Sequence, residues 1–183
     1  ESESSVKERA RRNPQALGQS VLSFINQGQK TSRVILRQAI LELPLNSGVL
    51  GGLGVPGLRK LRNTAYALEG ARFKSRDLQS FFQKQDWYLP NKAASQVKLS
   101  TVGQKNVTLS RLIETRLKKS RVGDGLPLLF NGYFNGVAVF SERPDGEHAT
   151  PIYFVSIDSN KTLLKLSGRG ASMGPGGQVS FSQ

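Results

Sequence analysis

The chain has 183 residues, 37% of them hydrophobic, and its 26 Lys and Arg outnumber 13 Asp and Glu, giving a formal net charge of +13. The chain has no cysteine and a single histidine, His148. This composition excludes disulfide frameworks, thiolate metal sites and multi-histidine metal clusters. The sequence contains no apolar run of about 18 residues, the length that a membrane-spanning helix needs.

The positive charge is concentrated in the middle of the chain. Residues 1–57 hold seven basic and four acidic side chains, residues 58–119 hold fourteen and four, and residues 120–183 hold five of each. We therefore divide the chain into an N-terminal segment, 1–57, a basic middle segment, 58–119, and a neutral C-terminal segment, 120–183. A segment with a net charge of +10 should attract polyanions, although basic helix surfaces often serve only solubility.

The N-terminal segment predicts two helices. The first begins at Asn13 as cap and ends at Gly28, since apolar residues recur between them at helical spacing. The second follows a cap at Thr31 or Ser32, is apolar on more than one side, and stops at Pro44.

A glycine-rich connection, residues 46–57, joins the N-terminal segment to the middle one. Gly52, Gly54 and Gly57 form a literal G-x-G-x-x-G, which in a dinucleotide fold follows a strand. Here the preceding residues predict a helix, and Pro56 stands before the third glycine. We interpret the connection as a flexible linker or tight turn and expect no cofactor.

The middle segment predicts three helices. The first is closed by Gly70, and the second has Ser75 as its cap with Asp77 in its first turn. A polar stretch then precedes a third helix over 107–119.

The C-terminal segment predicts a small antiparallel sheet followed by a loose glycine-rich tail over 168–177. Short runs rich in Val, Ile, Phe and Tyr alternate with turn residues, and 179–181 is a candidate edge strand. The expected strands are 126–130, 136–140, 152–157 and 162–166, separated by turns at 131–132, 135–136, 144–146 and 158–160. The fold class is therefore α+β, with helices in the N-terminal two thirds and a sheet after them.

The middle segment also carries an ordered series of motif residues. They are Leu61-Arg62-Asn63, Tyr66-Ala67-x-x-Gly70, Phe73, Leu78, Phe81-Phe82, Trp87-Tyr88-x-Pro90, Lys105-Asn106 and Glu114. Over roughly 58–115 this series resembles the YARHG domain, a short module of bacterial proteins that are mostly exported. The central Tyr-Ala-Arg-His-Gly of the family is here Tyr-Ala-Leu68-Glu69-Gly, so its Arg-His pair is absent.

The resemblance implies an extracytoplasmic bacterial setting and a non-catalytic module. It singles out eight residues with a structural or binding role, which are Leu61, Arg62, Asn63, Tyr66, Gly70, Phe73, Trp87 and Tyr88.

Each candidate site has a structural and a functional interpretation. Trp87 and Tyr88 could stack on sugar rings or bases, but we interpret them as core residues. We expect Trp87 to pack against Leu61, Phe73 and Phe81. His148, with Glu142, Asp145 and Glu147, could supply acid–base groups or a weak metal site, but the segment is more simply an exposed hairpin loop.

We predict a non-catalytic cell-envelope or extracellular module that binds an anionic polymer (a cell-wall glycan or an outer-membrane surface) or a protein partner. Nucleic-acid binding is the alternative, and a carboxylate-based hydrolase of cell-wall material is a further alternative. No catalytic residue and no metal ligand is assigned. The predicted ligand contacts are Arg59, Lys60, Arg72, Lys74 and Arg76.

Overall fold

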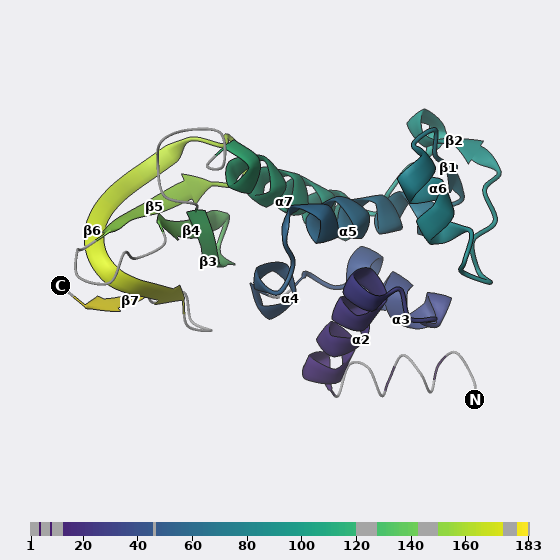
Figure 1. The fold of residues 1–183 in the computed structure, drawn as a ribbon, viewed down its shortest axis with the longest axis horizontal. Helices are drawn as coiled ribbons and strands as arrows, with labels where there is room; N and C mark the ends of the chain where they lie inside the picture. The colour runs from purple at the N-terminus through teal and green to yellow at the C-terminus, as the bar shows by residue number, and fades with distance from the viewer. Residues whose placement is uncertain are drawn as a thin grey trace. The chain divides into compact units, whose positions relative to one another are not determined.

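The computed structural model describes Ser4, Glu8 and residues 13–45, 47–119, 128–142, 150–173 and 179–182 (Figure 1). The chain divides into two compact units, which we call the helical unit, Glu1–Ser110, and the sheet unit, Arg111–Gln183. The prediction of an α+β fold, with helices first and an antiparallel sheet after them, is confirmed.

The helical unit consists of short helices and one two-stranded parallel ribbon. In chain order its elements are α2 (Pro14–Gln27), α3 (Arg33–Arg37), the π-helix η1 (Gln38–Glu42), α4 (Ser47–Gly51), α5 (Val55–Leu68), β1 (Ala71–Arg72), α6 (Arg76–Phe82), β2 (Lys92–Ala93), the 3₁₀ turn η2 (Ala94–Gln96) and α7 (Thr101–Lys119), whose last residues belong to the sheet unit.

The predicted ends of the first helix are confirmed at atomic level. The Asn13 side chain accepts a hydrogen bond from the Ala16 amide at 3.0 Å, and Gly28 stops α2 with φ at +68°. For the second helix the cap is Ser32, whose hydroxyl accepts from the Val34 amide at 3.3 Å.

The glycine-rich connection, interpreted as a flexible linker or tight turn, contains a short helix before its turn at Gly52, which the sequence did not predict. Residues 47–51 form α4, and Val49, Leu50 and Leu53 are buried. A Cβ at Gly52 would lie 3.0 Å from Leu22 Cδ2, so the glycine permits a close approach of α2. The segment contributes to the core because its apolar residues lie between its glycines.

One helix boundary of the middle segment also differs from prediction. Helix α7 begins at Thr101, because the Ser100 hydroxyl accepts from the Gly103 amide at 3.0 Å and caps a polar first turn. Ser75 occupies the cap position of α6 but makes no capping hydrogen bond, since its hydroxyl contacts Arg59 and Asp77 instead.

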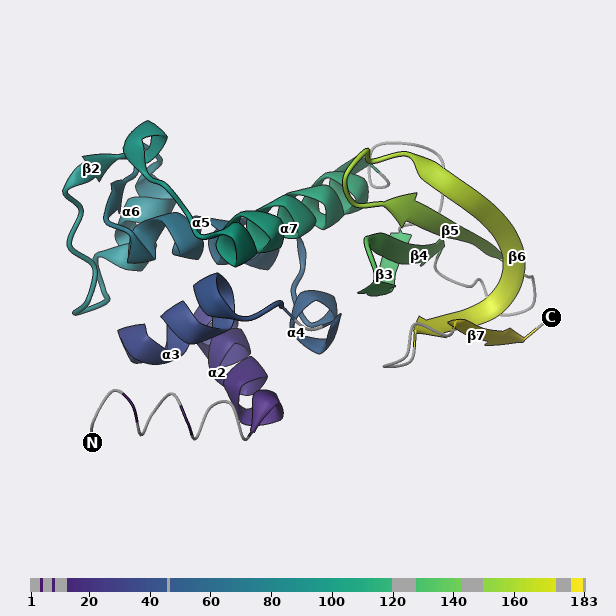
Figure 2. The ribbon, with the colours of Figure 1, turned by 180° about the vertical axis from the view of Figure 1, so that it is seen from behind.

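The sheet unit is an antiparallel meander in the order β3-β4-β5-β6-β7. The strands are β3 (Leu128–Phe134), β4 (Val137–Glu142), β5 (Thr150–Ser156), β6 (Thr162–Met173) and β7 (Val179–Ser182). Figures 1 and 2 show β6 as a long curved strand that pairs with β5 and then with β7. The buried core of the sheet is formed by Val139 and Ile152. Phe154, Leu166 and Val179 pack against them.

The turn predictions had mixed outcomes. Asn135 and Gly136 join β3 to β4 with φ of +46° and +79°, the conformation that an Asn-Gly hairpin favours. Asn131 and Gly132 lie within β3 instead, where the register is irregular, so the turn predicted there was wrong.

The tail and the loops gave further differences. The expectation of a loose tail from residue 168 was wrong for 168–173, because β6 continues to Met173. The predicted edge strand near 179–181 is confirmed as β7. The predicted turn at 144–146 and His148 lie outside the described residues, as do positions 126 and 127 of the first predicted strand.

Candidate binding surface

The aromatic motif residues form one cluster in the helical unit. Phe82 is fully buried at its centre, with ring centroids 5.1 Å from Phe73 and 5.5 Å from Tyr88. The Tyr88 hydroxyl donates to the Ala71 carbonyl at 2.9 Å, and burial raises the pKa of Tyr88. Tyr88 therefore uses both its ring and its hydroxyl within the fold.

Trp87 is half-buried at the edge of this cluster. Its aromatic neighbours are Phe24 at 6.1 Å, Phe82 at 6.4 Å and Tyr88 at 6.4 Å, rather than the predicted Phe73 and Phe81. Phe24 comes from α2 and also meets Phe81 edge-on at 5.2 Å. The sequence places Phe24 on the apolar face of the first helix but leaves open whether that helix packs on the middle segment; in the structure Phe24 is fully buried in the cluster.

Gly70 has a backbone reason to be glycine. Its φ is +83°, and a Cβ there would collide with Asn91 Oδ1. The Gly70 carbonyl accepts from the Asn91 and Lys92 amides, both at 3.0 Å, which starts the β1–β2 pairing. The motif glycine thus fixes where the chain leaves α5.

Four other motif residues lie on α5. Leu61 is fully buried, Tyr66 and Arg62 are half-buried, and the buried Asn63 side chain donates to the Arg59 carbonyl at 2.7 Å.

Asn106 of the motif has a role that the sequence did not reveal. Its Nδ2 donates to the Ile40 and Leu43 carbonyls at 2.9 and 2.8 Å, and its Oδ1 accepts from the Leu45 amide at 3.1 Å. These three bonds satisfy backbone groups that the end of η1 leaves without helical partners.

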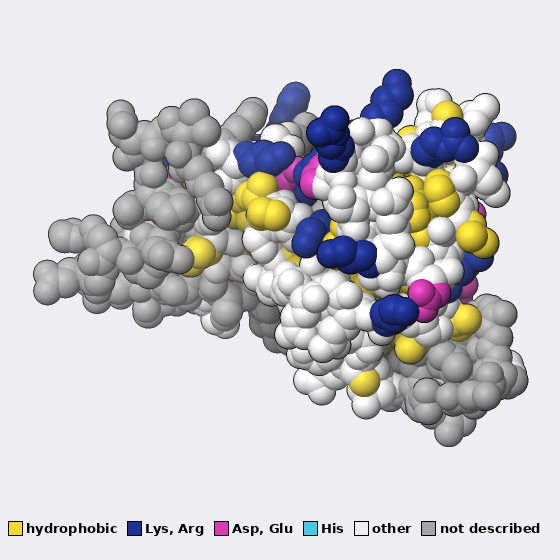
Figure 3. All heavy atoms as spheres, turned by 45° about the vertical axis from the view of Figure 1, so that its right-hand side comes forward, with side chains coloured by type: hydrophobic (Ala, Val, Ile, Leu, Met, Phe, Trp, Pro, Cys, Tyr) yellow, Lys and Arg dark blue, Asp and Glu magenta, His cyan; other side chains and the backbone are white. Residues whose placement is uncertain are grey.

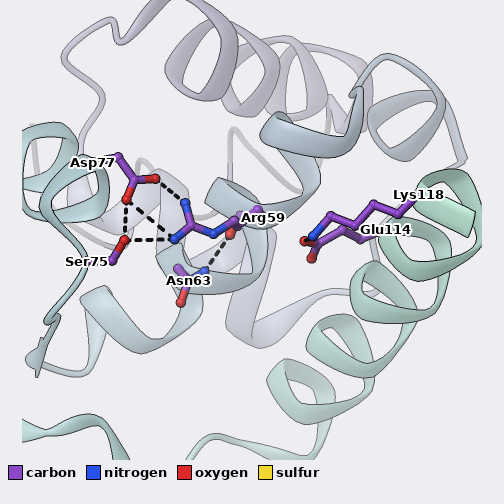
Figure 4. A network of polar contacts seen from close by, with 6 residues as sticks. All are labelled: Arg59, Asn63, Ser75, Asp77, Glu114 and Lys118. Atoms are coloured by element: carbon purple, nitrogen blue, oxygen red, sulfur yellow. Dashed lines mark hydrogen bonds and ion pairs between the residues drawn. The ribbon is translucent and has the colours of Figure 1, made fainter. Parts of the chain in front are cut away.

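Arg59 lies in a polar network with Ser75 and Asp77 (Figure 4). Its guanidinium forms an ion pair with the Asp77 carboxylate and donates to the Ser75 hydroxyl at 2.9 Å. Hydrogen bonds from Arg59 and Ser75 lower the pKa of Asp77 to about 2. Arg59 thus joins α5 to the start of α6, and Asp77 is a poor general acid.

Lys60 also makes contacts within the fold. Its Nζ donates to the Ile25 carbonyl at 3.3 Å and lies 4.7 Å from the Phe81 ring centroid. Similarly, Arg33 donates to the Leu68 carbonyl at 2.7 Å. Neither α2 nor α5 has a basic residue in its own last turn, so these distant cations stabilise both helix C-termini.

All four acidic residues of the middle segment form ion pairs. The residues that replace the family's Arg-His pair are Leu68, which is fully buried, and Glu69, which pairs with Arg37. The pairs are Glu69–Arg37 at 2.6 Å, Asp77–Arg59, Asp86–Lys30 at 2.9 Å and Glu114–Lys118 at 2.6 Å. These carboxylates are thus already neutralised within the chain.

Arg72, Lys74 and Arg76 are placed differently, and we call these three residues the cation strip. All three are exposed, and among the described residues none of them has an ion-pair partner. They alternate with the buried Ala71 and Phe73. Figure 3 shows Lys and Arg outnumbering acidic side chains on the face of the helical unit that it presents.

The sheet unit also holds side chains with a shifted pKa, among them Tyr153. The Tyr153 hydroxyl donates to Glu142 at 2.6 Å, and burial together with that carboxylate raises the pKa of Tyr153 to about 12. The other acidic residues proposed around His148 lie outside the described residues. Within the described ranges, no three His, Asp or Glu side chains gather as metal ligands.

Residues 37–115 match the family model of the YARHG domain. This match agrees with the resemblance that the motif residues of the middle segment carry. Neither the curated proteins nor the solved structures include a significant match. The match begins at Arg37, well before the first motif residue that the sequence suggested, and so includes the partner of Glu69.

YARHG domains are typically extracytoplasmic and generally non-enzymatic modules. None of the helices among the described residues is long and apolar enough to cross a membrane.

Proposed function

We propose that this protein is a non-catalytic binding module that holds an anionic polymer on the cation strip. One observation carries the proposal: the acidic residues of the basic segment are neutralised by ion pairs, while Arg72, Lys74 and Arg76 remain exposed. Exposed, uncompensated cations attract polyanions. A cell-wall glycan or an outer-membrane surface is the expected partner class in an extracytoplasmic setting.

Arg59 and Lys60 then have a supporting role. Their charged groups contact Asp77 and the end of α2 respectively, and releasing either would cost the fold an interaction. Their contribution to binding is to hold α5 against the segment that bears the strip.

The test is a charge-matched comparison of two triple variants. R72Q/K74Q/R76Q neutralises the strip, and K84Q/K98Q/K105Q neutralises three exposed lysines elsewhere in the helical unit. We expect the strip variant to weaken binding to polygalacturonate or lipopolysaccharide by roughly 3- to 150-fold, at roughly 0.2–1 kcal/mol for each of three exposed contacts. The control should bind nearly as the parent does, and both should melt like the parent.

Equal losses in the two variants would show that net charge alone attracts the polymer, and the strip would no longer be a site. DNA of matched charge is a necessary competitor, since a preference for it would favour nucleic-acid binding instead.

A further inference from the structure

The cation strip has a regular spacing. The chain from Ala71 to Arg76 alternates buried and exposed side chains, begins as β1, and is extended at Ser75, where φ is −74° and ψ is 122°. At about 3.3 Å per extended residue, successive cations lie roughly 6.6 Å apart along the backbone. The strip is therefore a short linear array rather than a diffuse patch.

The backbone beneath this array is held in place at every second residue. Ala71, Phe73 and Ser75, which each precede one of the cations, all make a hydrogen bond with a side chain from elsewhere in the helical unit, through the carbonyl at Ala71 and Phe73 and through the hydroxyl at Ser75, so the spacing is preorganised. The Tyr88 hydroxyl donates to the Ala71 carbonyl at 2.9 Å, and Gln79 Nε2 donates to the Phe73 carbonyl at 2.6 Å. Arg59 Nη2 donates to the Ser75 hydroxyl at 2.9 Å.

This arrangement has an electrostatic cost that a ligand would remove. By this spacing, neighbouring cations lie within a Debye length of each other, about 8 Å at physiological ionic strength, so Arg72 and Arg76 each repel Lys74. Arg76 is also the first residue of α6, where a positive charge opposes the helix dipole, and the nearby Asp77 is already paired with Arg59. An anionic chain along the strip would offset both effects.

We propose that the strip binds a linear phosphodiester polymer through consecutive backbone phosphates, an inference that rests on the proposed function. A phosphodiester chain has a full negative charge at every repeat, and the arginine fork matches phosphate oxygens. Phe73, the aromatic residue between Ala71 and Arg76, is buried and therefore not available for stacking. Recognition therefore involves the charged backbone and not bases.

The experiment moves one charge without changing composition. K74T/T108K exchanges Lys74 with Thr108, an exposed residue of α7, so net charge and amino-acid content stay the same. The probe is an abasic phosphodiester oligomer, titrated at several salt concentrations into the full chain, with K98T as a control at an exposed lysine outside the strip.

We expect the exchange to weaken binding roughly two- to fivefold, as the loss of one exposed ion pair does. The slope of log affinity against log salt should fall from about 2 to about 1.4, since each single-strand phosphate contact contributes about 0.7. K98T should leave both values unchanged.

The outcomes separate this inference from the proposed function. If K74T/T108K binds as the parent does while R72Q/K74Q/R76Q does not, the strip binds anions but its spacing is irrelevant, and the linear-array inference fails. If polygalacturonate binds more tightly than the phosphodiester and shows the same loss on exchange, the ligand is a carboxylated glycan, and the phosphodiester assignment is overturned. If neither variant weakens any binding, the proposed function itself fails.

Discussion

The helical unit and the sheet unit are held together by contacts of different range. In the helical unit the contacts that fix the helices join distant residues, such as Lys30 with Asp86 and Asn106 with Ile40, which are 56 and 66 positions apart. In the sheet unit every strand pairs with its neighbour in the chain. The helical unit therefore depends on tertiary side-chain contacts, whereas the sheet follows from local hairpins.

The two units also use charge differently. In the helical unit, cations from one helix satisfy the carbonyl ends or carboxylates of another, as Arg33 and Arg37 do. The C-terminal segment has equal numbers of basic and acidic residues, and the core of its sheet is apolar. The basic character of the chain is thus partly structural, and the cation strip is one group of cations that stays exposed for a partner.

The largest expected effect is the loss of stability when a buried aromatic residue is removed from either core, and it tests whether the two units unfold independently. Phe24→Ala should destabilise the helical unit by about 3–5 kcal/mol, because a fully buried aromatic side chain is lost. Phe140→Ala, also fully buried, should do the same to the sheet unit. Trp87 is the only tryptophan, so its fluorescence reports on the helical unit, while hydrogen exchange of β4 and β5 reports on the sheet. Equal shifts of both signals in both variants would mean that the units unfold together.

A smaller effect tests the long-range polar contacts of the helical unit. Asn106→Ala removes three hydrogen bonds to backbone groups near the end of η1 and should cost about 3 kcal/mol, at roughly 1 kcal/mol for each bond. Asn63→Ala is the matched control, with one bond to the Arg59 carbonyl and an expected cost of about 1 kcal/mol. Urea unfolding followed by Trp87 fluorescence measures both. Equal costs would show that the Asn106 contacts are not cooperative with the fold.

A still smaller effect compares one local element from each unit. Gly28 ends α2 and Gly136 lies in the β3–β4 turn, both with positive φ and both with open space where a Cβ would be. Changing either to alanine should cost about 1–2 kcal/mol, since the penalty is conformational rather than steric. Thermal melting of the two variants measures it. A much larger loss for Gly136→Ala would show that the sheet depends on its hairpin more strongly than the helical unit depends on a cap.

The smallest effect is a pH dependence of the Arg59–Asp77 pair. The pKa of Asp77 falls from 3.8 to about 2 in the folded chain, so the carboxylate stabilises the fold above about pH 4, and this stabilisation disappears as the pH falls towards 2. Asp77→Asn should lower the melting temperature slightly at neutral pH, and the difference from the parent should vanish near pH 2. A difference that stayed constant down to pH 2 would mean that the ion pair contributes nothing.

Whether the sequence could predict a residue of the candidate site also depended on whether its contacts are local or long-range. The exposed positions of Arg72, Lys74 and Arg76 agree with the alternation of apolar and basic residues in the sequence, which is a local pattern. The internal contacts of Arg59 and Lys60 are not local, because their partners Asp77 and Ile25 lie on other elements. Charge counting cannot distinguish a cation that binds a partner from one that caps a helix, since both have the same sequence signature.

The sequence by itself determined the fold class, the caps at Asn13 and Gly28, the Asn135–Gly136 hairpin and the motif of the family, because each depends on neighbours in the chain. Only the tertiary structure decided that residues 47–53 are core and that α2 completes the aromatic cluster through Phe24. The tertiary structure likewise decided which cations stay exposed. Burial and ion pairing are properties of surfaces that meet only when distant segments pack, and no local pattern contains that information.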